Sequence, residues 1–342
     1  MELRERQQTI LKKVVEEYIL TAAPVPSERL AGQPGLRVSS ATVRNELVEL
    51  EEMGLLAHPH TSSGRVPSDV GYRYYIDHLM SETWLSPTEQ QTIWHQFHQV
   101  EAEVDEWGPL AAAVTAHSAR SAALVTRPQA RRERVKRVEP VFIQEDVVLL
   151  VLIMRSGGVQ QRTLRMDQPV EREQLIRAGN RLSELLEGTS AAEVSRMALQ
   201  LQGLDQALAQ AIARLMEQTE RSWGDALYYE GINFVSGEPE FGRADRIMQL
   251  LEALQRGVVL SPLLQDTLES DRLKVVIGSE NELQQMQGCS LILKRYGPYD
   301  DAEGVVGVVG PTRMRYWRAA ALVRFMADLL DRLAEESLRE RR

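Results

Sequence analysis

The chain has 342 residues, a formal net charge of −9 and 43% hydrophobic residues. This composition excludes a disordered chain and predicts a globular protein of roughly two or three domains. No apolar run is long enough to cross a bilayer and the first residues form no signal-peptide core, so no membrane partner is expected. The single Cys289 excludes an internal disulfide framework and favours a cytoplasmic protein. The acidic charge still allows a nucleic-acid partner, because only a local patch must be positive.

The N-terminal segment is expected to begin with three helices. Apolar residues at helical spacing predict the first helix over residues 2–20. Ser27 is expected to cap a short second helix, and Ser39 or Ser40 a third. Gly54 ends the third helix, because glycine readily adopts the left-handed conformation common at helix ends.

A β-hairpin is predicted directly after the third helix. The stretch "LLAHPHTSSGRVP" has two short apolar runs on either side of a tip that contains Pro, Ser and Gly. Ser68 is then expected to cap a fourth helix. Three helices followed by a hairpin are typical of a winged helix-turn-helix, which we predict for residues 1–82.

A further helix is predicted over residues 86–107. Ser86 and Glu89 have the spacing of a capping box at its start. An apolar seam along this helix can pack against a second subunit or inside its own domain, and the sequence leaves both alternatives open. The seam consists of Phe97, Val100, Val104 and Trp107.

The rest of the chain mixes strands and helices, so the predicted fold class is α+β with several domains. Strands are predicted for the stretches "AALVT", "RVKRVEPVFI", "VVLLVLIM", "VQQRTLRM", "KVVIG", "CSLILKRY" and "GVVGVVG". Helices are predicted near residues 171–187, 191–201, 204–223, 243–255 and 317–339.

The third helix carries the residue types of a DNA-reading helix. Val43, Leu47 and Leu50 share the face expected to pack inward. In a helix-turn-helix the N-terminal end of the recognition helix meets the base edges. Arg can bond guanine, Asn can bond adenine, and Ser or Thr can bond bases or phosphate. Carboxylates fill the other end and would repel phosphate unless the helix enters the groove tip first. The predicted base-reading set is Ser39, Ser40, Thr42, Arg44 and Asn45.

The hairpin supplies the predicted phosphate contacts, because hydroxyl groups and Arg are common partners of phosphate. This predicted wing set consists of His60, Thr61, Ser62, Ser63 and Arg65. His58 and His60 have no Cys or Asp close by in the sequence, which is too few ligands for a metal site, so no metal is expected. Winged helices also serve as protein-interaction modules, and this alternative remains open at the level of the sequence.

Several long motifs resemble the heat-inducible transcription repressor HrcA family. They are "SSATVRNELVELEEMGLLAHPHTSSGRVPSDVGYRYYIDHLM", "RQQTILKKVVEEYILTAAPVPSERL", "VVIGSEN", "CSLILKRY" and "GVVGVVGPTRMRYW", in the family's order. The segment "GINFVSGEPEF" departs from the Ser-Asn-Leu-Leu pattern of the family. The resemblance implies a winged-helix domain, a GAF-like domain over residues 83–130 and 231–342, and an inserted dimerising subdomain over residues 131–230.

The same resemblance implies a function. It implies a homodimer that binds an inverted-repeat operator of double-stranded DNA, the CIRCE element, ahead of groE- and dnaK-type chaperone operons. Repression would end on heat stress, and a GroE-type chaperonin would be the partner that keeps the repressor active.

Other segments support alternatives to that function. A GAF-like domain can sense a small molecule, so an effector-responsive repressor is the second hypothesis. The basic run Arg127 to Arg137 can contact DNA, form a solvated loop and strand face, or take part in a subunit contact. "GVVGVVGP" lacks the spacing of a dinucleotide site, and no catalytic motif is present, so neither a cofactor nor an enzyme is expected. Arg313, Arg315 and Arg318 can face an effector or form a structural turn.

Overall fold

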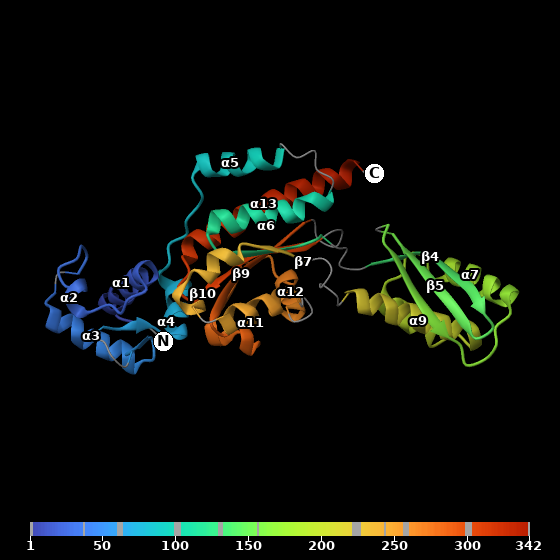
Figure 1. The fold of residues 1–342 in the computed structure, drawn as a ribbon, viewed down its shortest axis with the longest axis horizontal. Helices are drawn as coiled ribbons and strands as arrows, with labels where there is room; N and C mark the ends of the chain where they lie inside the picture. The colour runs from blue at the N-terminus through green and yellow to red at the C-terminus, as the bar shows by residue number, and fades with distance from the viewer. Residues whose placement is uncertain are drawn as a thin grey trace. The chain divides into compact units, whose positions relative to one another are not determined.

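The chain folds into two compact units (Figure 1), each with helices and sheet, which confirms an α+β fold of more than one domain. The computed structural model describes residues 3–36, 38–59, 64–98, 104–128, 133–155, 157–220, 227–242, 244–255, 260–297 and 303–340. The larger unit comprises Met1–Arg127, Ala226–Tyr296 and Gly304–Arg342. The inserted unit comprises Pro128–Asp225 and Gly297–Glu303.

The larger unit begins with three helices and a short antiparallel hairpin, in the predicted order. The helices are α1 (Glu5–Thr21), α2 (Ser27–Leu30) and α3 (Ser40–Glu52). Strands β1 (Leu56–Ala57) and β2 (Val66–Pro67) form the hairpin, which leads into α4 (Asp69–Tyr74) and a π-helical turn, Tyr75–Leu79.

Side-chain caps fix two of these helices where the sequence predicts them. The Ser39 hydroxyl accepts the Thr42 backbone N–H at 3.2 Å, and the Ser68 hydroxyl accepts that of Gly71 at 3.0 Å. The predicted cap at Ser27 is wrong: Ser27 is the first residue of α2 and is buried. The extended Pro26 precedes it, because proline has no N–H to lose there and ends the previous turn.

The first core of the larger unit lies among these helices. Val43, Leu47 and Leu50 of α3 are buried together with Ile10 and Val14 of α1, which confirms the predicted phase of the third helix. These aliphatic side chains fix α3 against α1, so the position of the start of α3 is set by packing rather than by the loop before it.

A five-stranded antiparallel sheet with strand order β7-β3-β10-β9-β8 forms the second part of the larger unit. Helices α6 (Val104–Ala119) and α13 (Tyr316–Glu340) cover one face, and α11 (Ala244–Gln255) and α12 (Ser261–Leu268) lie on the other side (Figure 1). The strands are β3 (Ala122–Thr126), β7 (Leu227–Glu230), β8 (Lys274–Ile277), β9 (Cys289–Tyr296) and β10 (Gly304–Pro311).

Gly307 in β10 shows how closely this sheet is packed. A Cβ atom at Gly307 would collide with the side chain of Leu293 and the carbonyl oxygen of Ile292 on the neighbouring strand. The glycine is therefore required by close strand packing, as the sequence suggests for this run.

The helix predicted over residues 86–107 is not one helix. The structure has α5 (Pro87–His98) and, as a separate element, α6, while residues 99–103 lie outside the described residues. The capping box is present, with the Ser86 N–H donating to Glu89 at 3.1 Å. Phe97 in α5 and Trp107 in α6 pack into the core of the larger unit. The apolar spacing that predicted one helix is thus used by two helices within one core.

The inserted unit is a three-stranded antiparallel sheet, β4-β5-β6, with helices packed on one face. Its strands are β4 (Val135–Gln144), β5 (Val147–Met154) and β6 (Val159–Arg165), and its helices are α7 (Arg172–Leu186), α8 (Ala191–Ala198) and α9 (Gly203–Glu220). Burial alternates along β5: Val148, Leu150, Leu152 and Met154 are buried and face the helices. Val147, Leu149, Val151 and Ile153 point to the other face.

The sequence patterns did not predict β7, α10 (Ile232–Ser236) or α12. The strand β7 lies within residues 131–230, which were assigned to the inserted domain, yet it pairs with β3 of the five-stranded sheet. The inserted segment therefore ends before β7, at Asp225. The finer division into three domains stays a prediction.

Candidate nucleic-acid interface

The predicted base-reading residues lie together at the start of α3. Ser39 precedes the helix, and its hydroxyl lies 3.0 Å from that of Thr42. Arg44 and Asn45 are exposed, and Ser40 is half-buried in the first turn. All five residues thus lie on one polar helix end, where the helix dipole also favours anions.

Arg44 is tied down only weakly in the free protein. Its guanidinium lies 3.1 Å from the carboxylate of Glu28 in α2, and both side chains are more than half exposed. A hydrogen bond from the backbone of Glu28 lowers the pKa of its carboxyl group, and the charge of Arg44 lowers it further. An exposed ion pair of this kind contributes little to stability, so Arg44 can leave it for a stronger partner.

The acidic half of α3 forms contacts within the protein. Glu46 is buried, with 4% of its surface exposed, and its carboxylate lies 2.6 Å from the Arg6 guanidinium and 3.8 Å from that of Arg4. Glu49 accepts hydrogen bonds from Arg4 and from the side-chain amide of Gln7. The side chain of Glu49 remains 43% exposed, and Arg4 and Gln7 reach it because the polar start of α1 lies beside it.

Arg65 lies at the base of the hairpin rather than at its tip. Only 16% of its side chain is exposed; Nη2 lies 2.8 Å from Glu51, and Nη1 lies 2.9 Å from Nδ1 of His58. Its backbone forms two hydrogen bonds with Val25, of 2.9 and 3.0 Å. Gly64 permits this approach, because a Cβ there would collide with the backbone of Pro24 and Val25. Arg65 thus holds the hairpin to α3 in the free protein.

The remaining wing residues predicted from the sequence, His60, Thr61, Ser62 and Ser63, lie outside the described residues. Within the described ranges, no group of three or more His, Cys, Asp or Glu side chains could hold a metal ion. Nor is any described helix both long and apolar enough to span a bilayer.

Helix α4 fastens these N-terminal helices to the edge of the five-stranded sheet. Arg73 donates to both carboxylate oxygens of Glu280, at 2.8 and 2.5 Å, and to the carbonyl of Val275 in β8 at 2.7 Å. The carboxylate of Asp69 accepts the Ser279 N–H at 2.8 Å. Burial raises the pKa of Glu280, but hydrogen bonds from Arg73 and from the Ile277 backbone outweigh this and lower it. These contacts were not predictable from the sequence, because their partners are some 200 positions apart.

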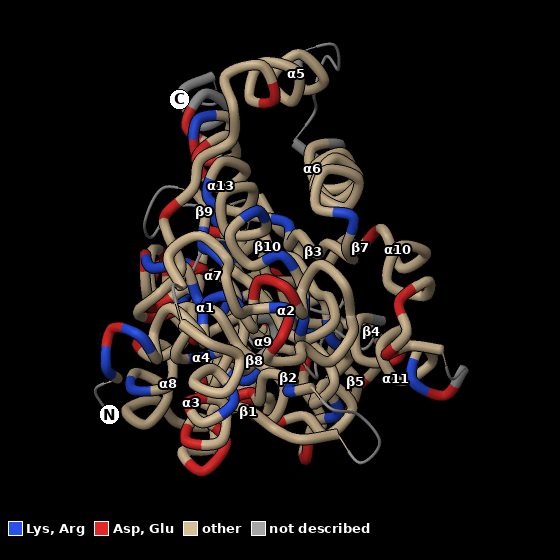
Figure 2. The backbone as a smooth tube through the Cα atoms, turned by 90° about the vertical axis from the view of Figure 1, so that its left-hand side faces the viewer, with Lys and Arg blue, Asp and Glu red and all other residues tan. Residues whose placement is uncertain are grey.

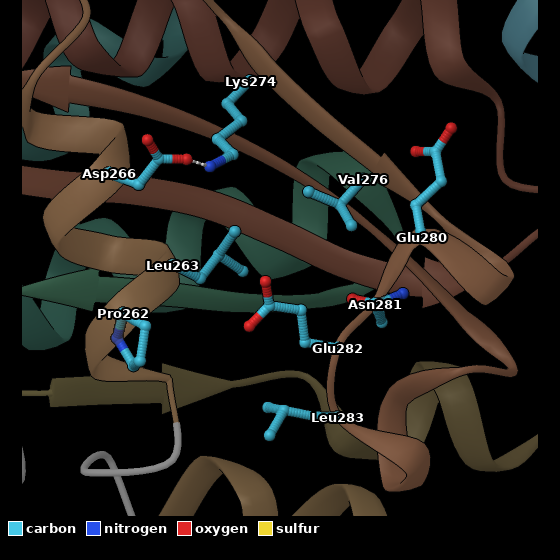
Figure 3. Close-up of a pocket in the computed structure, with 9 residues that line it drawn as sticks. All are labelled: Pro262, Leu263, Asp266, Lys274, Val276, Glu280, Asn281, Glu282 and Leu283. Carbon is cyan, nitrogen blue, oxygen red and sulfur yellow. Dashed lines mark ion pairs between the residues drawn. The ribbon is translucent and has the colours of Figure 1, made fainter.

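A pocket of about 420 Å³ lies between α12, β8 and the loop that follows β8 (Figure 3). Figure 3 shows Lys274 paired with Asp266 at one end and Glu282 directed toward the space between Leu263 and Leu283. Burial lowers the pKa of Lys274. The wall residue Glu280 is the one held by Arg73, so this pocket adjoins the attachment of α4.

Comparison with known proteins shows the family of this chain. The model of the HrcA protein C-terminal domain matches residues 110–320. A protein of Herpetosiphon aurantiacus named heat-inducible transcription repressor HrcA is 40% identical, over 100% of this chain and 98% of its own length. One of the same name from Thermomicrobium roseum is 42% identical, over 98% and 97%. The chain belongs to the heat-inducible transcription repressor HrcA family. The role of this family is regulatory and not enzymatic.

A solved structure supports the fold alone. The crystal structure of a hypothetical protein matches 98% of this chain and 100% of its own chain, with a TM-score of 0.63 and 22% identical residues. The similarity extends over both units of the fold and carries no information about ligands.

Proposed function

We propose that this protein is a DNA-binding repressor of groE- and dnaK-type chaperone operons, located in the cytoplasm and bound to the nucleoid at its operators. Its N-terminal helices and hairpin act as a winged helix-turn-helix, and its five-stranded sheet with α6 and α13 acts as a GAF-like domain. The observation that carries the proposal is the polar start of α3: Arg44 and Asn45 are exposed there, while Glu46 and Glu49 are neutralised by α1.

The charge distribution supports entry of α3 into the major groove by its tip. Base-reading groups gather at the N-terminal end of the helix. In its C-terminal half, Glu49, Glu46 and Glu51 are paired with Arg4, Arg6 and Arg65, respectively. Those pairs reduce the repulsion that free carboxylates would exert on nearby phosphates. For the wing, we keep His60, Thr61, Ser62, Ser63 and Arg65 as phosphate contacts; Arg65 would have to share its guanidinium with Glu51.

A homodimer would place two copies of α3 on the two half-sites of an inverted repeat such as CIRCE. The open face of the inserted sheet, which we define as Val141, Leu149, Val151, Ile153 and Val159, supports this assembly. Val141 and Val159 are 42% and 64% exposed, and the strand register places Arg137, Glu139, Gln161 and Thr163 on the same face beside these apolar residues. A two-fold axis can pair this face with itself, because an isologous contact uses the same patch twice. Two linked reading helices then bind far more tightly than one.

The test is a titration of duplexes containing the inverted repeat found upstream of chaperone operons, with Arg44→Ala and Arg44→Lys as a matched pair. Arg44→Ala should cost about 1–3 kcal/mol of specific binding and relax preference at one base pair per half-site. Arg44→Lys keeps the charge but loses the bidentate fork, so it should recover non-specific affinity and little specificity. Equal losses on operator and random DNA would assign Arg44 to phosphate instead.

Heat release and the chaperonin belong to the same proposal. Titrations from growth to shock temperature, with and without a GroE-type chaperonin, separate intrinsic sensing from chaperonin control. An affinity that falls with temperature only when the chaperonin is occupied by unfolded protein would identify the chaperonin as the sensor.

The second candidate function is an effector-responsive repressor. The pocket between α12 and β8 favours it, because Glu280 is both a wall of that pocket and the anchor of α4. Operator binding that is unchanged after the protein is denatured, freed of small molecules and refolded would argue against a co-repressor.

A further inference from the structure

A second pocket, of about 310 Å³, is lined by an unusual number of arginines. It lies where the end of α1 meets the turn between β10 and α13 and the turn after α6. Figure 2 shows basic segments close together where β10, α13 and the end of α6 meet. The lining arginines are Arg120, Arg313, Arg315 and Arg318.

Two of these arginines are neutralised inside the protein and two are not. Arg313 pairs with Glu238 and lies 2.6 Å from Glu240, and Arg318 lies 3.0 Å from Glu89. Arg120 lies over the ring of Phe234, 5.7 Å from its centroid. Neither Arg120 nor Arg315 has a carboxylate partner in the described part of the chain. The pocket therefore has positive charge without an internal counterion.

Ser121 adds a hydrogen-bonding group to the same pocket. The residue is only 8% exposed and lines the cavity, which its hydroxyl can reach as a donor. An acceptor bound in the cavity could take a hydrogen bond from this hydroxyl. The pocket thus offers a hydroxyl donor beside guanidinium groups that have no carboxylate partner. Both groups suit an anion with hydrogen-bond acceptors.

The pocket beside β8 differs in this respect (Figure 3). Its Lys274 is paired with Asp266, its Glu280 with Arg73, and the Asn281 amide donates to the carbonyls of Gly278 and Cys289. These groups are satisfied without a ligand. The arginine-lined pocket is therefore the stronger candidate for a binding site.

We propose that the arginine-lined pocket binds a small phosphate-bearing anion that regulates the repressor. Guanidinium groups form paired hydrogen bonds with phosphate oxygens, and several of them converging on one cavity suit a di- or triphosphate group better than a single carboxylate. The anion would contact Ile19 and Leu20 of α1 on one side and Arg315, just before α13, on the other. Its occupancy would therefore change the contact between the reading module and the five-stranded sheet, and this regulatory consequence rests on the proposed function.

Inorganic pyrophosphate is the probe for the binding step. Calorimetric titration of the full chain at low ionic strength, without DNA, should show one site per chain. Arg315→Ala and Arg120→Ala should each weaken binding by about 10-fold or more, as expected for loss of a charge-assisted hydrogen bond. Arg315→Lys should recover part of the affinity, and Ser121→Ala should weaken it by a few-fold.

The matched control is Arg214→Ala, which removes an exposed arginine of the inserted unit. It should bind pyrophosphate as the wild type does. Thermal unfolding of each variant without ligand establishes that the fold is intact, which is expected for the exposed Arg315. No binding by the wild type, or equal binding by all variants, would overturn the proposal.

A second arm separates free phosphate from the DNA backbone as the source of the anion. Operator affinity is measured against salt concentration for the wild type and Arg315→Ala, with and without pyrophosphate. A pyrophosphate effect that Arg315→Ala abolishes supports regulation. A flatter salt dependence in Arg315→Ala, together with no pyrophosphate binding, would make the cluster a DNA-backbone contact and refute the proposal. Pyrophosphate binding without any operator binding would refute the proposed repressor function but would still support the pocket as an anion-binding site.

Discussion

The two larger sheets of this protein differ in how many of their faces are covered by helices. All eight residues of β10 in the five-stranded sheet are buried, because helices cover both faces of that sheet. In β5 of the inserted unit, buried and half-buried residues alternate strictly, because its helices cover one face only. Yet the half-buried positions of β5 are Val147, Leu149, Val151 and Ile153, which are as apolar as the buried ones. In the proposed dimer, a second subunit would cover these apolar positions of β5.

The largest expected effect is the loss of stability when a residue on the covered face of the inserted sheet is truncated. Leu150 is fully buried under the helices, so Leu150→Ala should lower the free energy of unfolding by about 2–5 kcal/mol. Leu149→Ala, its neighbour on the open face, should cost clearly less in a dilute, monomeric sample. Urea unfolding followed by circular dichroism measures both. Equal losses would mean that the two faces are buried alike, and the contrast between the sheets would fail.

A charge on the open face tests whether a second subunit covers it. Leu149→Asp should leave the secondary structure unchanged and halve the mass measured by sedimentation, because an unpaired carboxylate is costly in a buried interface. Operator affinity should then fall by about 100-fold or more, since two reading helices are no longer linked. Leu199→Asp, at an exposed leucine off the sheet, is the control and should stay dimeric. A dimeric Leu149→Asp variant would place the subunit contact elsewhere.

Acidic pH tests the edge of the five-stranded sheet, where Arg73 covers the carbonyl of Val275 in β8. The folded-state pKa of Glu280 is lower than its ordinary value. Its contribution to stability is therefore complete above the ordinary pKa of a glutamate and is lost as the pH falls through the lowered one. The melting temperature of the wild type should fall in this range slightly more than that of Glu280→Gln, by the equivalent of about 1 kcal/mol or less. Parallel pH profiles would show that the pair does not stabilise the edge.

The smallest expected effect concerns the thiol of Cys289 in β9, which should react slowly with a thiol reagent while the protein is folded. Cys289 is 2% exposed, and burial raises its pKa to about 12. Because the thiolate is the reactive form, a disulfide reagent at pH 8 should leave the folded protein unlabelled and react fully after unfolding. Rapid labelling without denaturant would show that the five-stranded sheet opens transiently. Its strands would then be less protected from solvent than their burial in the folded state indicates.

Local patterns predicted most of the elements, but not how they are assembled. The strands of both sheets except β7, and the helices of the inserted unit, follow from apolar periodicity, and the caps at Ser39 and Ser68 follow from residue type. The strand β7 was missed because it has only four residues, none of them fully buried. Its pairing with β3 joins residues about a hundred positions apart, and local periodicity contains no information on such contacts.

The candidate interface shows the same limit. Its exposed residues were predictable, because a polar cap followed by Arg and Asn indicates a helix start at which side-chain and backbone donors face solvent. The role of the carboxylates was not, since the pairing of Glu46 with Arg6 requires α1 and α3 to be in contact. Likewise, Arg65 was expected to reach for DNA, whereas the fold places Glu51 beside it. The number of charged residues in a sequence segment does not show which of them form ion pairs, because their partners are brought close only by the fold.

The inserted unit leaves and re-enters the larger unit on neighbouring strands. Thr126 at the end of β3 is the register partner of Leu227 at the start of β7. The chain on either side of the insertion is thus already brought together by backbone hydrogen bonds, as at the two ends of a hairpin. A gene in which a short Gly-Ser turn replaces residues 128–225 would close that hairpin directly. If the proposed dimer forms through the inserted sheet, exchanging residues 128–225 would change how subunits assemble without altering the N-terminal helices and hairpin.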